Sequence, residues 1–242
     1  MSKKAVFSVI IPAYKEEKRL PKNIGDFISF SKDYKYPVEL IFVDDGSPDG
    51  TSKVIKKSLK GLKNARLIRL PENQGKGAAI CAGMKVASGE FLLFADADNS
   101  TPIWQAKKFF DAVDKKTVLI GSRYVAGAHL QKRQPLFRVL GSRILNLFVQ
   151  VILLPGVKDT QCGFKLFPKA VVEEMLPKLR FRGFSFDLEM LAAAKHLGYR
   201  IKEVPVVWRD DPRSMVSPIR DGIKFVVDTI RIKVSLIGGR YD

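Results

Sequence analysis

The sequence predicts an α/β fold with a mainly parallel central sheet, and two observations support this prediction. Apolar, β-branched segments that suit buried strands alternate with longer segments whose apolar residues recur at helical spacing. Turn-forming residues separate many of these segments. Alternation of strand and helix favours parallel pairing through right-handed crossovers, with helices covering both faces of the sheet.

The first strand and helix lie near the start of the chain. Residues 6–12 (VFSVIIP) are apolar and β-branched, which predicts a strand. Residues 16–34 have helical periodicity. The inward face of this helix is expected to consist of Leu20, Ile24, Phe27, Ile28 and Ser31.

The second unit repeats the order. Residues 38–43 (VELIFV) predict a strand, which ends in the turn-rich stretch 44–50. Thr51 is expected to cap a basic helix that reaches about Asn64. Residues 66–70 predict a short third strand.

Three further elements complete the predicted sheet region. Residues 75–88 are rich in small side chains, which predicts a helix packed closely on the sheet. Residues 90–95 and 117–121 predict two more strands.

Two carboxylates, Asp96 and Asp98, follow the strand at 90–95. Because side chains alternate along a strand, the pair should point the same way, ~6 to 7 Å apart along the chain. Together they can hold one Mg²⁺ or Mn²⁺ ion, which would share its other positions with water and substrate phosphates. The alternative is a solvated acidic turn. The alternation of strands and helices argues against a solvated turn, because it places the two carboxylates at the edge of the sheet.

Ligands of parallel α/β sheets bind beyond the carboxyl ends of the strands. Three polar clusters are predicted at that edge: residues 12–16, Asp44 with Asp45, and Asp96 with Asp98. We therefore expect a single binding site there.

Several motifs in order resemble those of family 2 glycosyltransferases. They are VIIPAYKEE at 9–17, VDDGSPDGT at 43–51, NQGKGAA at 73–79, ADAD at 95–98 and GSRY at 121–124. DTQCGFKLF at 159–167 and FSFDLEML at 184–191 resemble the polyprenyl-phosphate branch of that family, most closely its dolichyl-phosphate β-glucosyltransferases. The resemblance implies a GT-A type, Rossmann-like fold and UDP-glucose as donor, although it separates glucose from mannose only weakly.

The resemblance also implies a set of nucleotide-sugar residues, namely Pro12, Ala13, Tyr14, Glu16, Val43, Asp44, Asp45, Lys76 and Asp96. Backbone groups of 12–16, with the Tyr14 ring and the Glu16 carboxylate, could line the base and ribose pocket, or form a plain strand-to-helix turn. Asp44 or Asp45 could accept the uracil imide N–H, while the other caps the loop.

Lys76 lies in a Gly-Lys-Gly loop, where it is predicted to meet phosphate as a point charge. The loop is not a Walker A motif, because Gly77 follows the lysine and Leu70 occupies the place of the first glycine.

The composition favours an anionic partner. The chain has 42 Lys and Arg residues against 25 Asp and Glu residues, a net charge of +17. Nucleic acid, phospholipid and phosphorylated lipid all satisfy this charge. Aromatic residues such as Phe91, Phe94, Phe109 and Phe110 fall within predicted strands and helices. This argues against stacking platforms and therefore against nucleic acid.

At 242 residues the chain suits one catalytic domain, with a nucleotide-sugar half at 1–125 and an acceptor and membrane-interface half at 126–242. Cys81 and Cys162 predict neither a disulfide framework nor a zinc site. The start of the chain does not resemble a signal peptide. These features predict a cytoplasmic protein, peripheral on the cytoplasmic face of a membrane.

Residues 131–157 predict an amphipathic helix with a basic start. Its apolar stripe is Phe137, Leu140, Ile144, Leu147, Val151 and Leu154. The uncharged stretch 144–157 is too short to span a bilayer, which needs about 20 residues, so it should lie on the surface. A second stripe is Ile223, Val227, Ile230, Val234 and Ile237. Packing on the core or on a second copy is the alternative for both.

A lipid monophosphate acceptor needs a cationic cradle more than a base, since its second pKa is near ~6. Arg123, and Arg138 with Ser142 four residues later, resemble the positions that bind the acceptor phosphate in lipid-phosphate glycosyltransferases. General contact with anionic lipid is the alternative for Arg138 and for Arg143.

Asp187 falls where relatives with hydroxyl acceptors place a general base. In this branch it could instead orient the hydroxyls of the donor sugar or a lysine, and Glu189 could be structural. We count Asp98, Arg123 and Asp187 as the candidate catalytic residues.

The resulting hypothesis is an inverting, metal-dependent transfer of glucose from UDP-glucose to dolichyl or polyprenyl phosphate. Three alternatives stay open: mannose transfer from GDP-mannose, a basic nucleic-acid-binding protein, and an inactive membrane-surface scaffold. The intact Asp96 and Asp98 pair argues against the scaffold. Oligomeric state stays open.

Overall fold

The structure is a computed structural model that describes residues 6–130, 136–209 and 218–242, with side chains for 6–130, 141–209 and 222–242. The strands are β1 (Phe7–Ala13), β2 (Val38–Asp44), β3 (Ala65–Arg69), β4 (Phe91–Ala95), β5 (Thr117–Ser122), β6 (His129–Leu130), β7 (Phe164–Pro168), β8 (Arg200–Pro205) and β9 (Val207–Trp208). The α-helices are α1 (Leu20–Asp33), α2 (Thr51–Ser58), α3 (Lys76–Val86), α4 (Ala106–Asp111), α5 (Leu136–Ile152), α6 (Lys169–Met175), α7 (Phe186–His196) and α8 (Pro218–Ile237). Two 3₁₀ turns, η1 (Ile103–Gln105) and η2 (Leu176–Lys178), precede α4 and follow α6.

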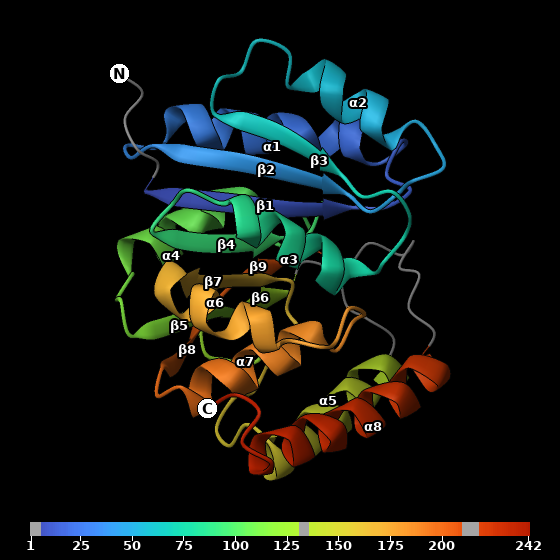
Figure 1. The fold of residues 1–242 in the computed structure, drawn as a ribbon, viewed down its shortest axis with the longest axis vertical. Coiled ribbons are helices and arrows are strands. Elements are labelled where there is room, and N and C mark those ends of the chain that lie inside the picture. The colour runs from blue at the N-terminus through green and yellow to red at the C-terminus, as the bar shows by residue number, and fades with distance from the viewer. Residues whose placement is uncertain (1–5, 131–135, 210–217) are drawn as a thin grey trace.

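A seven-stranded sheet forms the centre of the protein, in the order β3-β2-β1-β4-β7-β5-β8 (Figure 1). All neighbouring strands are parallel except at β7, which is antiparallel to both β4 and β5. The predicted α/β fold with a mainly parallel sheet is confirmed. The strand order reverses at β1, so the carboxyl ends of β1 and β4 border the crevice where such sheets bind ligands.

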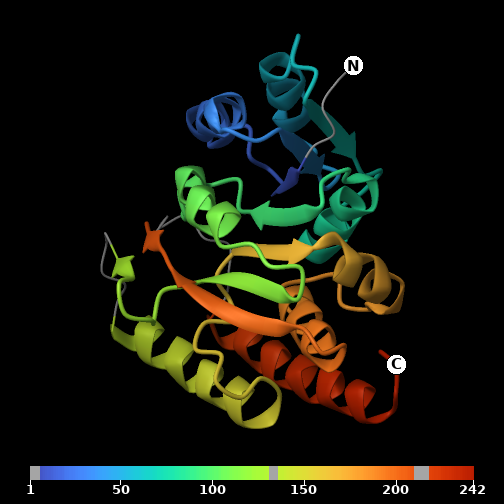
Figure 2. The ribbon, with the colours of Figure 1, turned by 90° about the vertical axis from the view of Figure 1, so that its left-hand side faces the viewer.

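Helices cover both faces of the sheet and create two hydrophobic cores (Figures 1 and 2). Helices α1, α2 and α4 pack on one face, and α3, α6 and α7 pack on the other. The predicted close packing of the small-residue helix is confirmed at Gly83. A β-carbon there would lie 2.5 Å from a methyl group of Ile10 on β1.

The basic helix after the second strand differs from the prediction. It ends at Ser58 instead of near Asn64, and Gly50 precedes its first residue. Thr51 does not cap the helix. Its hydroxyl accepts the Glu16 N–H at 2.8 Å and donates to Asp49 at 2.5 Å, which ties the loop after β1 to α2.

Helices α5 and α8 lie side by side at the edge of the molecule farthest from β3 (Figures 1 and 2). Within the part of the chain that the structure describes, no helix is both long and apolar enough to cross a membrane. Leu154 departs from the predicted stripe, because it lies beyond the end of α5 and is fully buried in the core.

Eight large apolar side chains on α5 and α8 are exposed to solvent instead of packed on the core, whereas Val149, Phe225 and Ile232 on the same helices are buried. The exposed fractions of the eight reach 61% at Leu147 and 71% at Val151 on α5. The exposed residues are Ile144, Leu147 and Val151 on α5, and Ile223, Val227, Ile230, Val234 and Ile237 on α8. Core packing, one of the alternatives for these stripes, is therefore excluded for these eight residues.

Glu39 is a buried charge within the apolar strand β2. Its carboxylate accepts hydrogen bonds from the Ser8 hydroxyl on β1 and from the Ser88 N–H and hydroxyl just before β4, and it pairs with Arg66 on β3. Burial opposes ionisation, but these hydrogen bonds and Arg66 outweigh it and lower the pKa of Glu39. One carboxylate thus joins four neighbouring segments of the sheet.

We expect Glu39→Gln to lower the free energy of unfolding by about 1 to 3 kcal/mol, since it weakens charge-assisted hydrogen bonds in a buried site. Because the folded pKa is depressed, the stabilisation by Glu39 is complete above the unfolded value of about 4.3. It is lost as the pH falls through the folded pKa. Urea unfolding at pH 7 and at progressively lower pH measures both effects.

Glu174→Gln is the matched control, because Glu174 is exposed on α6. A loss of stability as large in this control as in Glu39→Gln would contradict the assignment.

Candidate active site

Two loops at the carboxyl edge of the sheet have an unusual backbone conformation. Lys15, directly after β1, and Asn99, after the turn that follows β4, are the two non-glycine residues with positive φ in the described residues, both at 55°. Residues other than glycine adopt this left-handed backbone conformation only at an energetic cost, and such residues are often found at functional sites. Asn99 is held there by its side chain, which accepts the Ile103 N–H at 2.8 Å and donates to Asp26 at 2.9 Å.

Asp96 and Asp98 follow the end of β4 as predicted, but they lie in a turn, so the alternation of side chains expected from a strand does not extend to them. The Asp96 carbonyl accepts the Asn99 N–H at 3.0 Å, and Ala97 between the two carboxylates is buried. Both carboxylates are nevertheless close enough to interact. Burial and the neighbouring Asp96 charge raise the pKa of Asp98.

This pair suits a hard divalent cation that also binds substrate. Two mutually repelling carboxylates provide oxygen ligands, and a bound cation would relieve their repulsion. No cluster of three or more His, Cys, Asp or Glu side chains with metal-binding geometry occurs among the described residues. That Asp96 and Asp98 hold Mg²⁺ or Mn²⁺ together with water and substrate phosphates stays a prediction.

Lys76 is the first residue of α3, and its Nζ lies 2.5 Å from Oδ1 of Asp96. Burial disfavours the charged ammonium, but Asp96, with Asp187 and Asp98 adding, outweighs it and raises the pKa of Lys76. The lysine predicted to meet phosphate thus pairs with one of the predicted metal ligands.

The loop that carries Lys76 is held in place from two directions. Asp45 accepts the Gln74 N–H at 2.8 Å and the Gly75 N–H at 2.9 Å. On the other side, the Gly77 N–H donates to the Arg182 carbonyl at 2.7 Å.

Asp44 also binds within the protein. It is fully buried, accepts the Ser47 N–H at 2.9 Å, and is bonded to the Ser52 hydroxyl on α2. Asp44 and Asp45 therefore both shape the loops around the site. A uracil contact by one of them stays a prediction.

The other residues predicted to bind the nucleotide sugar lie at or just after the ends of β1 and β2. The side chains of Ala13 and Val43 are buried in the core, so they can reach a ligand only through the main chain. Glu16 is buried and paired with Arg19. Pro12 and Tyr14 are partly exposed, and their roles toward the nucleotide stay predictions.

Asp187, in the first turn of α7, forms a buried ion pair with Lys165 of β7. The Lys165 Nζ lies 2.8 Å from Oδ2 of Asp187 and also donates to the Cys162 carbonyl at 2.6 Å. Asp187 therefore pairs with a lysine, as in one of the alternatives that the sequence left open, and its role toward the substrate stays a prediction. Glu189 is structural, because its carboxylate accepts the Arg180 and Phe181 N–H groups and the Tyr241 hydroxyl.

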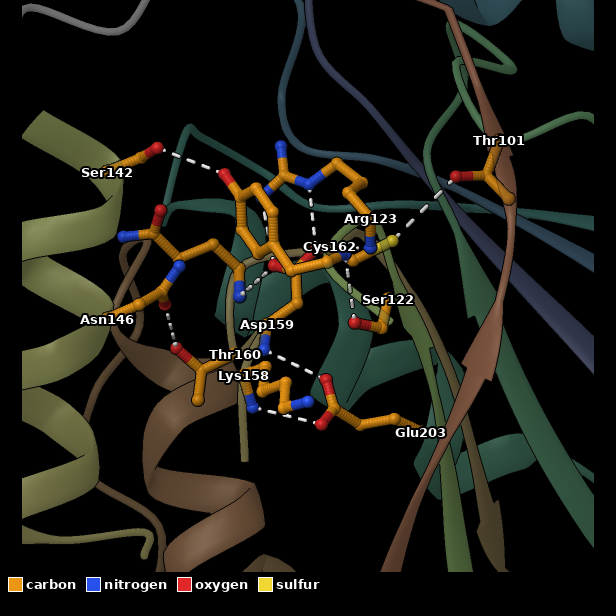
Figure 3. A network of polar contacts seen from close by, with 12 residues as sticks. Thr101, Ser122, Arg123, Ser142, Asn146, Lys158, Asp159, Thr160, Cys162 and Glu203 are labelled. Atoms are coloured by element: carbon orange, nitrogen blue, oxygen red, sulfur yellow. Dashed lines mark hydrogen bonds and ion pairs between the residues drawn. The ribbon is translucent and has the colours of Figure 1, made fainter. Parts of the chain in front are cut away.

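Arg123 has an acidic partner that sequence reasoning did not identify (Figure 3). The Asp159 carboxylate accepts hydrogen bonds from Nε and Nη2 of Arg123 at 2.8 and 2.9 Å, and from the Arg123 backbone N–H at 2.9 Å. Asp159 in turn accepts the Gln161 N–H, while its own N–H donates to Glu203 of β8 at 3.0 Å. The guanidinium also lies 5.2 Å from the Trp208 ring centre.

The start of α5 contacts the same region. The Ser142 hydroxyl lies 3.0 Å from the hydroxyl of Tyr124, the residue that follows Arg123 in the chain (Figure 3). One turn later, Asn146 accepts the Thr160 hydroxyl at 3.2 Å. The structure thus places Ser142 beside Tyr124, next to Arg123 in the chain, whereas the Arg138 side chain lies outside the described residues. The predicted binding of the acceptor phosphate by these residues stays a prediction.

Sequence reasoning missed Lys165 and Asp159 as site residues. Both lie in the DTQCGFKLF motif at 159–167, which was the available signal. A motif does not reveal which residue its charged side chains bind.

The comparisons with known proteins identify the family. The model of Glycosyl transferase family 2 matches residues 8–176. The chain belongs to this family and is a glycosyltransferase.

Three similar curated relatives are named dolichyl-phosphate β-glucosyltransferase. The *Dictyostelium discoideum* protein is 34% identical over 245 residues, covering 96% of this chain and 75% of the relative. Those of *Saccharomyces cerevisiae* and *Homo sapiens* are 33% and 32% identical, each covering 97% of this chain and 76% of the relative.

Solved structures confirm the GT-A type fold. Glucosyl-3-phosphoglycerate synthase from *Mycobacterium tuberculosis*, in complex with Mn²⁺ and UDP-glucose, superposes with a TM-score of 0.67 at 18% identity, over 98% of this chain and 80% of that one. At this identity the likeness establishes the fold.

We expect Lys165→Met and Asp187→Asn each to destabilise the protein, by about 3 to 5 kcal/mol where a buried charge loses its partner. The double variant should be less destabilised than the sum of the two, with a coupling of about 0.5 to 3 kcal/mol. Chemical unfolding of all four proteins gives this cycle. Additive losses would show that the two side chains do not stabilise each other.

Proposed function

We propose that this glycosyltransferase moves glucose from UDP-glucose to the phosphate of dolichol or a similar polyprenol, with inversion to a β-linked lipid-phosphate sugar. One observation carries the proposal, namely two polar clusters at the carboxyl edge of the sheet. In the first, Lys76 lies beside the carboxylates that follow β4, an arrangement suited to a metal ion and a diphosphate. The second contains Arg123, after β5, and Ser142 of α5. The names of the similar relatives, which match nearly the whole chain, support the acceptor and the sugar.

On the donor side, Lys76 and the loops after β1 and β2 would bind the nucleotide sugar. A divalent cation held by Asp96 and Asp98 would stabilise the negative charge of the departing diphosphate. A solved structure of the same fold, titled as containing Mn²⁺ and UDP-glucose, supports this choice of donor and ion.

On the acceptor side, we propose that the lipid phosphate is itself the nucleophile. A phosphate oxygen forms the new bond to the anomeric carbon from the face opposite the diphosphate. The carbon–oxygen bond to UDP breaks, and its electron pair leaves with UDP. The phosphate is largely dianionic near pH 7, so the step needs no base.

Arg123 and Ser142 would orient the phosphate in this scheme. Arg123 already pairs with Asp159, so it would act as a rigid, preorganised donor toward the acceptor. The Lys165 pairing of Asp187 supports an orienting role for this carboxylate over a general-base role.

The exposed apolar faces of α5 and α8 support a peripheral membrane location, which we propose to be a cytoplasmic face. Basic side chains lie on the same helices, including Arg143, Lys224 and Arg231. Apolar side chains inserted at the interface, next to cations that attract anionic head groups, would hold the acceptor site at the bilayer.

The substrate proposal is tested by assaying UDP-glucose, GDP-mannose and other nucleotide sugars with a short polyprenyl phosphate. We expect transfer from UDP-glucose with Mn²⁺ or Mg²⁺, none after Asp98→Ala, and none to the free polyprenol. The acidic limb of the pH profile should follow the lipid phosphate near ~6.

Efficient transfer from GDP-mannose alone would replace glucose by mannose in the proposal. Transfer to the free alcohol would contradict the phosphate nucleophile.

For the membrane, we expect the protein to sediment with anionic vesicles and high salt to weaken but not abolish binding, since screening removes only the charge contribution. Leu147→Glu with Val151→Glu should release it. Val86→Glu is the control, because Val86 is an exposed apolar residue on α3. Unchanged sedimentation of the double variant would show that α5 is not the binding face.

A further inference from the structure

Lys76 lies against a carboxylate that the proposed function needs for a metal ion. Its Nζ is 2.5 Å from Oδ1 of Asp96, and the Asp98 and Asp187 charges also act on it. A lysine ammonium and a divalent cation both bind carboxylate oxygen, and each positive charge repels the other. The ammonium therefore competes with a cation for Asp96.

The backbone around Lys76 is held in place, so a change of partner by its ammonium would have to come from rotation of the side chain. Gly75 has a φ of 97°, and its N–H is bound to Asp45. Gly77 cannot carry a side chain without clashing, because a β-carbon there would lie 2.5 Å from the β-carbon of Phe186. The ammonium can change partners by side-chain rotation while the helix start stays fixed.

The Asp96 carboxylate also lies against the main chain of Gly163. A β-carbon on Gly163 would lie 1.9 Å from Oδ2 and 2.7 Å from Oδ1 of Asp96. The carboxylate thus has two close neighbours, the main chain of Gly163 and the ammonium of Lys76. Oδ1 is the oxygen that the ammonium contacts, so this oxygen would become available to a cation if the ammonium changed partner.

We propose that Lys76 makes metal binding and nucleotide binding depend on each other. Without nucleotide, its ammonium neutralises Asp96 and weakens the binding of a divalent cation. A bound diphosphate attracts the ammonium away, and Asp96 becomes available to the cation. This inference rests on the proposed use of a nucleoside diphosphate sugar, and it adds a coupling that the transfer reaction itself does not require.

Thermodynamic linkage makes the effect reciprocal. If the diphosphate tightens Mn²⁺ binding by some factor, Mn²⁺ tightens diphosphate binding by the same factor. Part of such a coupling arises from direct attraction between cation and diphosphate in any open site. The part due to Lys76 is the part that disappears with its charge.

The test measures Mn²⁺ affinity by electron paramagnetic resonance of the free ion, with and without UDP, in wild type and Lys76→Met. For wild type we expect weak Mn²⁺ binding alone and a gain with UDP of about 5- to 150-fold, the usual range of coupled sites. Lys76→Met should bind Mn²⁺ alone more tightly than wild type and UDP less tightly. Its coupling factor should be several-fold smaller.

Two variants separate charge from structure. Lys76→Arg keeps the positive charge and should retain most of the coupling. Lys85→Met removes the same charge from an exposed position on the same helix and should behave as wild type. If Lys76→Met does not fold, Lys76→Gln gives the same comparison, and thermal unfolding of each variant checks the fold.

The outcomes distinguish this inference from the proposed function. If wild type couples UDP and Mn²⁺ but Lys76→Met keeps the full coupling, or binds Mn²⁺ alone no more tightly, the role of Lys76 is wrong while the donor proposal stands. If wild type binds no UDP with or without Mn²⁺, the donor proposal fails and this inference fails with it.

Discussion

Three ion pairs at the carboxyl edge of the sheet hold together segments that are far apart in the sequence. They are Lys76 with Asp96, Lys165 with Asp187, and Arg123 with Asp159. In the Lys165–Asp187 and Arg123–Asp159 pairs the carboxylates are buried, and a buried charge without a partner is costly, so their cations must lie with them. These two pairs therefore help to hold α7 and the loop after β5 against the sheet, while the more exposed Lys76–Asp96 pair joins α3 to the turn after β4.

Residues 159–165 take part on both sides of the site. Asp159 pairs with Arg123, the main chain of Gly163 packs against the Asp96 carboxylate, and Lys165 pairs with Asp187. The segment leads into β7, the strand that is antiparallel to its neighbours β4 and β5. Because β7 lies between those two strands, this one short segment contacts both Asp96, a proposed metal ligand, and Arg123, a residue of the proposed acceptor site.

Helix α5 has two kinds of surface that fit a lipid substrate. Ser142, near its start, contacts Tyr124 beside Arg123, while Leu147 and Val151 are exposed. A phosphate head group held at the first region would have its hydrocarbon chain close to the second. The proposed acceptor therefore matches the distribution of polarity along one helix.

The sequence alone determined the order of strands and helices from β1 to β4 and the strand β5, because apolar periodicity reports locally which segments are buried and on which face. It also determined that residues 12–16, Asp44 with Asp45, and Asp96 with Asp98 meet at one edge, since parallel strands bring their carboxyl ends together. It did not predict α4, or the elements β6, β7, α6, α7, β8 and β9 that complete the second half of the fold. It did not determine which charges pair. Arg123 and Asp159 are 36 residues apart, and Lys165 and Asp187 are 22 apart. Only the tertiary structure decided these partners, because a pairing depends on which strands become neighbours, and a local pattern carries no information about the residue opposite.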